Sequence, residues 1–97
     1  MRTFYSEYIQ HCARFYARHP NPTYRSDVDK WNWLACDRAL KGFEPREREI
    51  ILFVYREGDT IADNIYQVSK RLTINQDTIW KLIARFERSV AKRRGLL

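Results

Sequence analysis

The sequence predicts an all-α protein of about five helices. Of its 97 residues, 44% are hydrophobic and 14% are aromatic, whereas only three are glycine and three are proline. This composition excludes a disordered chain and favours helices. Apolar residues also recur at spacings of three and four along most of the chain, which is the helical period. A chain of this length forms one small core, so we expect residues 1–97 to be a single domain.

The first helix is expected over residues 3–19. Its wide apolar stripe indicates that it packs against the rest of the molecule. The stripe consists of Phe4, Tyr8, Cys12 and Phe15, with Tyr5, Ile9 and Tyr16 beside it. Pro20 and Pro22 end this helix, because proline cannot continue one and favours extended geometry in the residue before it.

A second helix is expected from Ser26 to about Lys41. Ser26 and Asp29 form a start that resembles a capping box, with Asp29 in place of the usual Glu or Gln. Gly42 is a plausible end. The apolar residues that follow at helical spacing are Val28, Trp31, Ala35, Ala39 and Leu40.

The third helix is expected to open at Pro45, where the missing N–H costs nothing. Glu47 lies in its first turn, where the helix dipole favours negative charge. Its dense apolar content predicts the central helix of the core: Ile50, Ile51, Leu52, Phe53 and Val54. The run Glu57, Gly58, Asp59 and Thr60 ends this helix and caps a fourth over residues 60–72.

The last two helices are expected to meet at a sharp corner. The fourth carries an apolar stripe of Ile61, Ile65, Val68 and Leu72, and the fifth carries Ile79, Leu82, Ile83, Phe86 and Val90. Asn75 is a strong N-cap, and Ile74 and Ile79 can form a hydrophobic staple. Because only Thr73 and Ile74 separate the two elements, the sequence predicts a three- to four-helix core that ends in a helix-turn-helix.

Positive charge gathers on the last predicted helix. The chain has a formal net charge of +6, and residues 76–97 hold six basic residues against Asp77 and Glu87. A helix with one apolar face and a cationic remainder suits a groove lined with phosphates. A solvated basic face that keeps the protein soluble is the alternative. The tight turn and the polar start of this helix favour nucleic acid.

Two stretches resemble region 4 of bacterial sigma factors. Residues 39–52 have an Ala-Leu pair, a proline and an Arg-Glu-rich turn before an aliphatic helix, as the opening of that region has. Residues 69–90 look like its helix-turn-helix, with Ser69, Leu72, Ile74, the cap Asn75 and the pair Thr78-Ile79. The resemblance covers residues 39–97. Residues 1–38 do not resemble the sigma segment that melts DNA and form an N-terminal helical extension, so a small regulator of the kind phages and mobile elements encode is the more economical interpretation.

This resemblance implies that the last helix, about Gln76–Arg94, enters the major groove of double-stranded DNA while other helices contact RNA polymerase. Such residues can pair with base edges and clamp phosphate oxygens. By position, the groove-facing residues are Gln76, Asp77, Trp80 and Lys81, and those nearer the phosphates are Asn75, Thr78, Arg85 and Arg88. One small helix-turn-helix makes few base contacts, so a homodimer or the polymerase is expected to add specificity.

Some residues depart from the region 4 pattern. The segment between Tyr55 and Ser69 is longer than in the family, Thr73 stands where glycine is common, and Phe86 stands where a small residue is usual. Helix packing is therefore expected to differ. Trp80 is bulky for a groove position, and it fits either a thymine methyl or a protein-binding surface.

The alternative function is a protein-interaction module that binds RNA polymerase, a sigma factor or a second copy through exposed aromatics. Trp31 and Trp33 are two residues apart and cannot face the same side of a helix. Trp33 either packs against the first helix or contacts a partner. RNA binding has less support, because the aromatic-plus-glycine signatures of common RNA modules do not occur.

Catalytic and metal-binding patterns are not found. His11 and His19 lie about two helical turns apart, too far for paired ligation of one metal, and neither CxxC, HExxH nor a glycine-rich phosphate loop occurs. We expect no enzyme activity, cofactor, metal or small-molecule substrate. Cys12 and Cys36 are expected to be buried thiols rather than a disulfide. Without a signal-peptide pattern or a long apolar run, we expect a cytoplasmic protein with no membrane contact.

Overall fold

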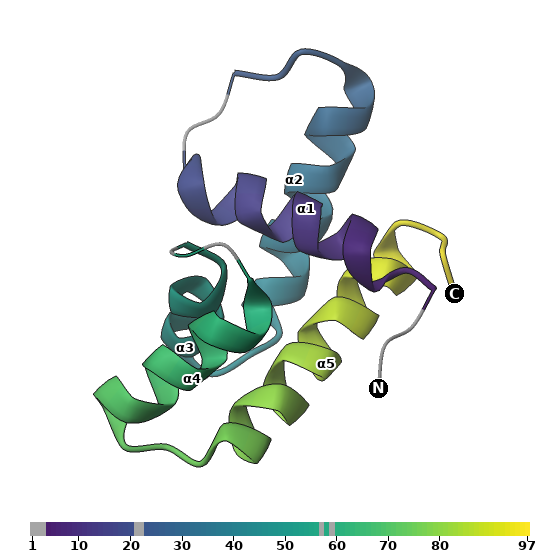
Figure 1. Cartoon of the computed structure of the whole chain (residues 1–97). Helices are drawn as coiled ribbons and strands as arrows, with labels where there is room; N and C mark the ends of the chain where they lie inside the picture. Colours follow the sequence, from purple (N-terminus) through teal and green to yellow (C-terminus); the bar gives the residue numbers. More distant parts are fainter. Residues whose placement is uncertain (1–3, 21–22, 57, 59) are drawn as a thin grey trace.

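The computed structural model describes residues 4–20, 23–56, 58 and 60–97. These residues form five helices and no strand, which confirms the predicted all-α class. The helices are α1 (Ser6–Arg18), α2 (Asp27–Lys41), α3 (Pro45–Arg56), α4 (Ile61–Leu72) and α5 (Gln76–Arg93). In Figure 1, α3 and α4 lie on one side of the molecule and α5 runs along the other, with α1 packed against the upper half of α5.

Side-chain caps define where three helices begin, as the sequence predicts. The cap oxygen accepts a hydrogen bond from a backbone N–H in the first turn: Ser26 from Asp29 (3.2 Å), Thr60 from Asp63 (3.2 Å) and Asn75 from Asp77 (2.8 Å). Such caps satisfy N–H groups that the helix itself cannot. Pro45 begins α3, and Gly42 follows the last residue of α2.

The first helix is shorter than predicted. It begins at Ser6 and ends at Arg18, and the N–H of His19 donates to the carbonyl of Tyr16 at 3.4 Å. Thr3, Asn21 and Pro22 at its predicted limits lie outside the described residues, as do Glu57 and Asp59 between α3 and α4.

The apolar stripes of all five helices meet in one buried cluster. Its largest fully buried side chains are Tyr55, Phe86, Ile9, Ile51, Ile65, Ile79, Val54 and Val90. The ring of Phe86 lies 5.8 Å from that of Tyr55 and 6.2 Å from that of Phe43, so this bulky residue links α5 to the start and the end of α3. Helix packing thus accommodates Phe86 where a smaller residue was expected.

Two of the predicted stripes are only partly buried. Phe4, Tyr8, Val28 and Trp31 are exposed, with Phe4 and Trp31 at 82% and 53%. The buried face of α1 is instead shifted toward Ile9, Cys12 and Ala13. A wide aromatic stripe covers more surface than the neighbouring helices can bury, so the sequence overestimates how much of it enters the core.

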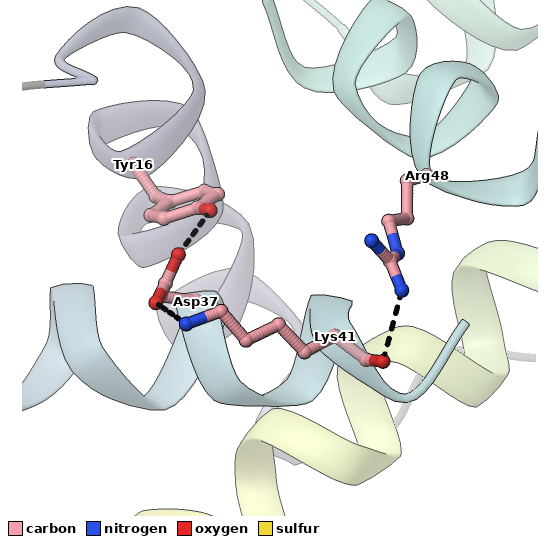
Figure 2. Close-up of polar contacts among 4 residues, drawn as sticks. All are labelled: Tyr16, Asp37, Lys41 and Arg48. Atoms are coloured by element: carbon pink, nitrogen blue, oxygen red, sulfur yellow. Dashed lines mark hydrogen bonds and ion pairs between the residues drawn. The ribbon is translucent and has the colours of Figure 1, made fainter. Parts of the chain in front are cut away.

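A polar network ties α1, α2 and the start of α3 together (Figure 2). The hydroxyl of Tyr16 donates to Asp37 Oδ1 at 2.8 Å, Lys41 Nζ lies 3.0 Å from Asp37 Oδ2, and Arg48 donates to the carbonyl of Lys41 at 3.2 Å. Burial alone would raise the pKa of Asp37, but the hydrogen bonds from Tyr16 and Lys41 hold it below its ordinary value of 3.8. The Asp37 carboxylate is therefore engaged within the fold.

Trp33 belongs to the contact between α2 and α1. Its ring lies 5.0 Å from that of Tyr16, and its indole N–H donates to the carbonyl of His19 at 2.9 Å. Of the two interpretations of Trp33, the structure therefore favours packing against the first helix.

Cys12 and Cys36 are buried, unpaired thiols, as predicted. Burial raises the pKa of Cys12 to about 11 and raises that of Cys36 further, so both stay protonated at neutral pH. None of the described helices combines the length and the apolar content needed to cross a membrane.

Candidate nucleic-acid interface

A three-residue connection, Thr73 to Asn75, joins α4 to α5. Thr73 has φ 55° and ψ 48°, the left-handed conformation that favours glycine, and its N–H donates to the carbonyl of Ser69. The N–H of Ile74 donates to the same carbonyl at 3.1 Å. The chain therefore keeps the backbone geometry of a glycine turn although a threonine occupies it.

One face of α5 is buried in the core. It holds all five residues of the predicted stripe, Ile79, Leu82, Ile83, Phe86 and Val90, together with Glu87 and Ala91. This burial fixes the rotation of α5 about its axis, because turning the helix would expose the stripe. The opposite face is consequently directed to solvent.

The eight predicted site residues are all exposed: Asn75, Gln76, Asp77, Thr78, Trp80, Lys81, Arg85 and Arg88. Asp77, Lys81 and Arg88 share a line along α5, because they follow one another at spacings of four and seven residues.

Ala84 lies on the same line and is exposed, and Lys92 is exposed one turn beyond Arg88. Neither was predicted as a site residue. The helical period extended from Asp77 would have found both. The small side chain of Ala84 lets another molecule approach the backbone of α5 closely between two cations.

The ion pairs on this face are weak enough to exchange. Lys81 Nζ lies 3.2 Å from Asp77 Oδ2, and both side chains are more than 70% exposed. Such surface pairs contribute little to stability and are screened by salt. A phosphate group can therefore compete with Asp77 for Lys81.

Arg85 is held more firmly than its neighbours. Its Nη1 lies 3.4 Å from Glu47 Oε2 in the first turn of α3, and its guanidinium lies 5.1 Å from the centre of the Phe43 ring. Arg85 therefore connects α5 to α3. To contact a phosphate it would have to share or leave Glu47, whereas Lys81 and Arg88 need no such change on α3.

The aromatic first helix does not cover the exposed face of α5. A groove of about 940 Å³ separates α1 from the first half of α5, and His11, Arg14, Trp80 and Lys81 are among its lining residues. Trp80 is 42% exposed at the edge of this groove. Gln76, Lys81 and Arg85 thus remain accessible to a ligand.

Glu87 is buried rather than part of the charged surface that the sequence predicted. It is 6% exposed, and its Oε2 accepts a hydrogen bond of 2.7 Å from the hydroxyl of Tyr55. Burial raises the pKa of Glu87, and hydrogen bonds with Tyr55, Gln10 and Ser6 offset part of that rise. Asp77 is then the single exposed carboxylate side chain among residues 76–97, which the structure describes throughout, against six basic side chains.

The part of the chain that the structure describes holds no group of three or more His, Cys, Asp or Glu residues that could bind a metal ion. No protein-family model matches the chain, and no curated protein or solved structure matches it. The resemblance of residues 39–97 to sigma region 4 therefore stays a prediction from the residues.

Proposed function

We propose that the chain is a sequence-specific, double-stranded DNA-binding transcription regulator of the sigma region 4 type. In this proposal α4, the connection and α5 act as a helix-turn-helix, and α5 enters the major groove. The observation that carries it is the exposed line of Asp77, Lys81, Ala84 and Arg88 opposite the buried face of α5. A cationic helix face whose other side is anchored in a core is what insertion between phosphates requires.

The residues divide by the chemistry each can offer to DNA. Gln76, Asp77 and Lys81 in the first turns of α5 read base edges, since an amide pairs with adenine, a carboxylate accepts from cytosine and an ammonium donates to guanine. Trp80 lies beside them and contacts a thymine methyl. Around this centre, Asn75, Thr78, Arg85 and Arg88 bind phosphates and fix the orientation of the helix.

The predicted contact with RNA polymerase and the predicted homodimer are further parts of this proposal. A recognition helix of this size reads few base pairs, so a second copy or the polymerase would supply the remaining specificity. The alternative function, a protein-interaction module, loses Trp33 as an exposed anchor, because its indole is committed to α1.

Selection of binding sites from random duplex DNA tests the proposal, run with the whole chain in the presence and in the absence of RNA polymerase. We expect an enriched sequence motif in at least one of the two arms. The matched control is the Gln76→Ala, Lys81→Ala double variant, which keeps the buried face of α5 and should lose the enrichment. Random recovery in both arms would contradict the proposal, as would the same motif from the double variant.

A further inference from the structure

A second pocket lies at the other end of α5, where this helix meets α2. Its volume is about 460 Å³, and it is lined by Trp31, Leu34, Ala35, Arg38, Arg93 and Arg94. Trp31, Arg38 and Arg93 are exposed, while Leu34 and Arg94 are half-buried and Ala35 is buried. The pocket therefore combines an apolar floor with an exposed indole and three guanidinium groups.

Arg94 is held in place by neighbouring side chains. Its Nε donates to Asn32 Oδ1 at 2.6 Å, and Asn32 Nδ2 donates to the hydroxyl of Tyr8 at 2.9 Å. The guanidinium of Arg94 also lies 6.0 Å from the centre of the Trp31 ring. One wall of the pocket is thus arranged before a ligand arrives, which lowers the ordering cost of binding.

The charge of the pocket is uncompensated by its own lining. The lining residues, all of them described, include no carboxylate. Asp37 lies next to Arg38 in the chain, but its carboxylate is engaged by Tyr16 and Lys41 (Figure 2). Three guanidinium groups without an acidic neighbour in the lining attract an anionic partner.

We propose that this pocket binds an acidic segment of a partner protein, in which a large apolar side chain is flanked by Asp and Glu. The apolar side chain packs on Trp31, Leu34 and Ala35, and the flanking carboxylates pair with the guanidinium groups of Arg38 and Arg93. Arginine and tryptophan are the residues most often found as energetic anchors of protein interfaces.

Two other occupants fit the pocket less well. The phosphate backbone of a DNA duplex is convex and offers no apolar group to cover Trp31 and Leu34. A second copy of this chain is itself basic, with a net charge of +6, so the two pockets and their surroundings would repel one another.

The pocket is separate from the proposed DNA-binding residues. Asp77 and Arg93 are sixteen positions apart, which corresponds to about 24 Å along a helix axis, or about two widths of a major groove. The chain can therefore hold an acidic segment at one end of α5 while the other end is bound to DNA. The proposal itself does not depend on DNA binding.

A labelled synthetic peptide tests the inference with the whole chain. The probe carries Phe and Leu flanked by Glu and Asp, and a matched peptide carries Gln and Asn in place of the acids. Fluorescence anisotropy should show binding of the acidic probe and at least about tenfold weaker binding of the neutral one. The Arg38→Glu, Arg93→Glu double variant should weaken binding of the acidic probe by at least about tenfold, and Trp31→Ala by several-fold.

Controls keep the result interpretable. Arg46→Glu makes the same kind of charge change on exposed α3 and should leave the affinity within about twofold. Arg38→Ala with Arg93→Ala removes the charges without placing carboxylates at the end of α5, and circular dichroism checks that each variant is folded. The inference is overturned if the wild type does not bind the acidic probe or binds both probes equally. It is also overturned if the arginine variants weaken duplex DNA binding as much as peptide binding, or if Trp31→Ala dissociates a dimer without changing peptide affinity.

Discussion

The two faces of α5 differ in how completely the rest of the molecule determines them. On the buried face, Phe86 packs between Phe43 and Tyr55, and Glu87 accepts the Tyr55 hydroxyl. On the exposed face, Lys81 has a single loose ion pair with Asp77. The buried face fixes where the helix lies, and the exposed face keeps side chains that a ligand can rearrange at low cost. Structure and proposed function thus depend on different residues of one helix.

The largest effect that tests this division is the loss of Phe86. Phe86→Ala should lower the free energy of unfolding by about 3–5 kcal/mol, because it leaves a cavity between two aromatic rings. Arg88→Ala on the exposed face should change it by less than about 0.5 kcal/mol. Urea unfolding monitored by circular dichroism measures both. Similar losses in the two variants would remove the distinction between the faces.

The next effect concerns the buried carboxyl group of Glu87. Because burial raises its pKa in the folded state, the neutral acid favours folding. This stability is fully present below the ordinary pKa of 4.5 and is lost as the pH rises through the raised pKa, by up to about 1.4 kcal/mol per pH unit.

Glu87→Gln should flatten that decline above pH 4.5. Asp37 provides an internal contrast, because its lowered pKa affects stability in the opposite direction, at pH values below about 3.8. Urea unfolding across this pH series compares the two chains. An identical decline in wild type and Glu87→Gln would show that Glu87 ionises as freely in the fold as in the unfolded chain.

The smallest effect concerns the turn that connects α4 to α5. Thr73→Gly should raise the free energy of unfolding by about 0.5 kcal/mol, because glycine adopts the left-handed conformation without a side-chain penalty, although it gives the unfolded chain more freedom. Thermal unfolding detects such a change. A destabilised glycine variant would mean that the Thr73 side chain contributes contacts worth more than the relief of its backbone.

Features that depend on neighbouring residues were the ones that the sequence predicted well. The caps Ser26, Thr60 and Asn75 each bond to an N–H two or three residues away, so composition and spacing suffice to locate them. The exposure of Lys81 and Arg88 follows in the same way from the helical period of α5.

Features that depend on distant residues were missed. Glu87 is buried because Tyr55, 32 residues away, and two side chains of α1 surround it. Arg85 is held by Glu47, 38 residues away. Trp31 is exposed because no helix covers that part of α2, and helical spacing alone cannot distinguish a covered stripe from an uncovered one.

The most direct test of the proposed DNA-binding face is the salt dependence of duplex affinity. The measurement compares the wild type with a double variant, Lys81→Ala with Arg88→Ala, on a duplex recovered by selection. The control is Lys30→Ala, an exposed cation on α2. We predict that the double variant binds more weakly and that its slope of log affinity against log salt is smaller by about two, one for each lost phosphate contact, while Lys30→Ala keeps the wild-type slope. Equal slopes for the wild type and the double variant would contradict the account.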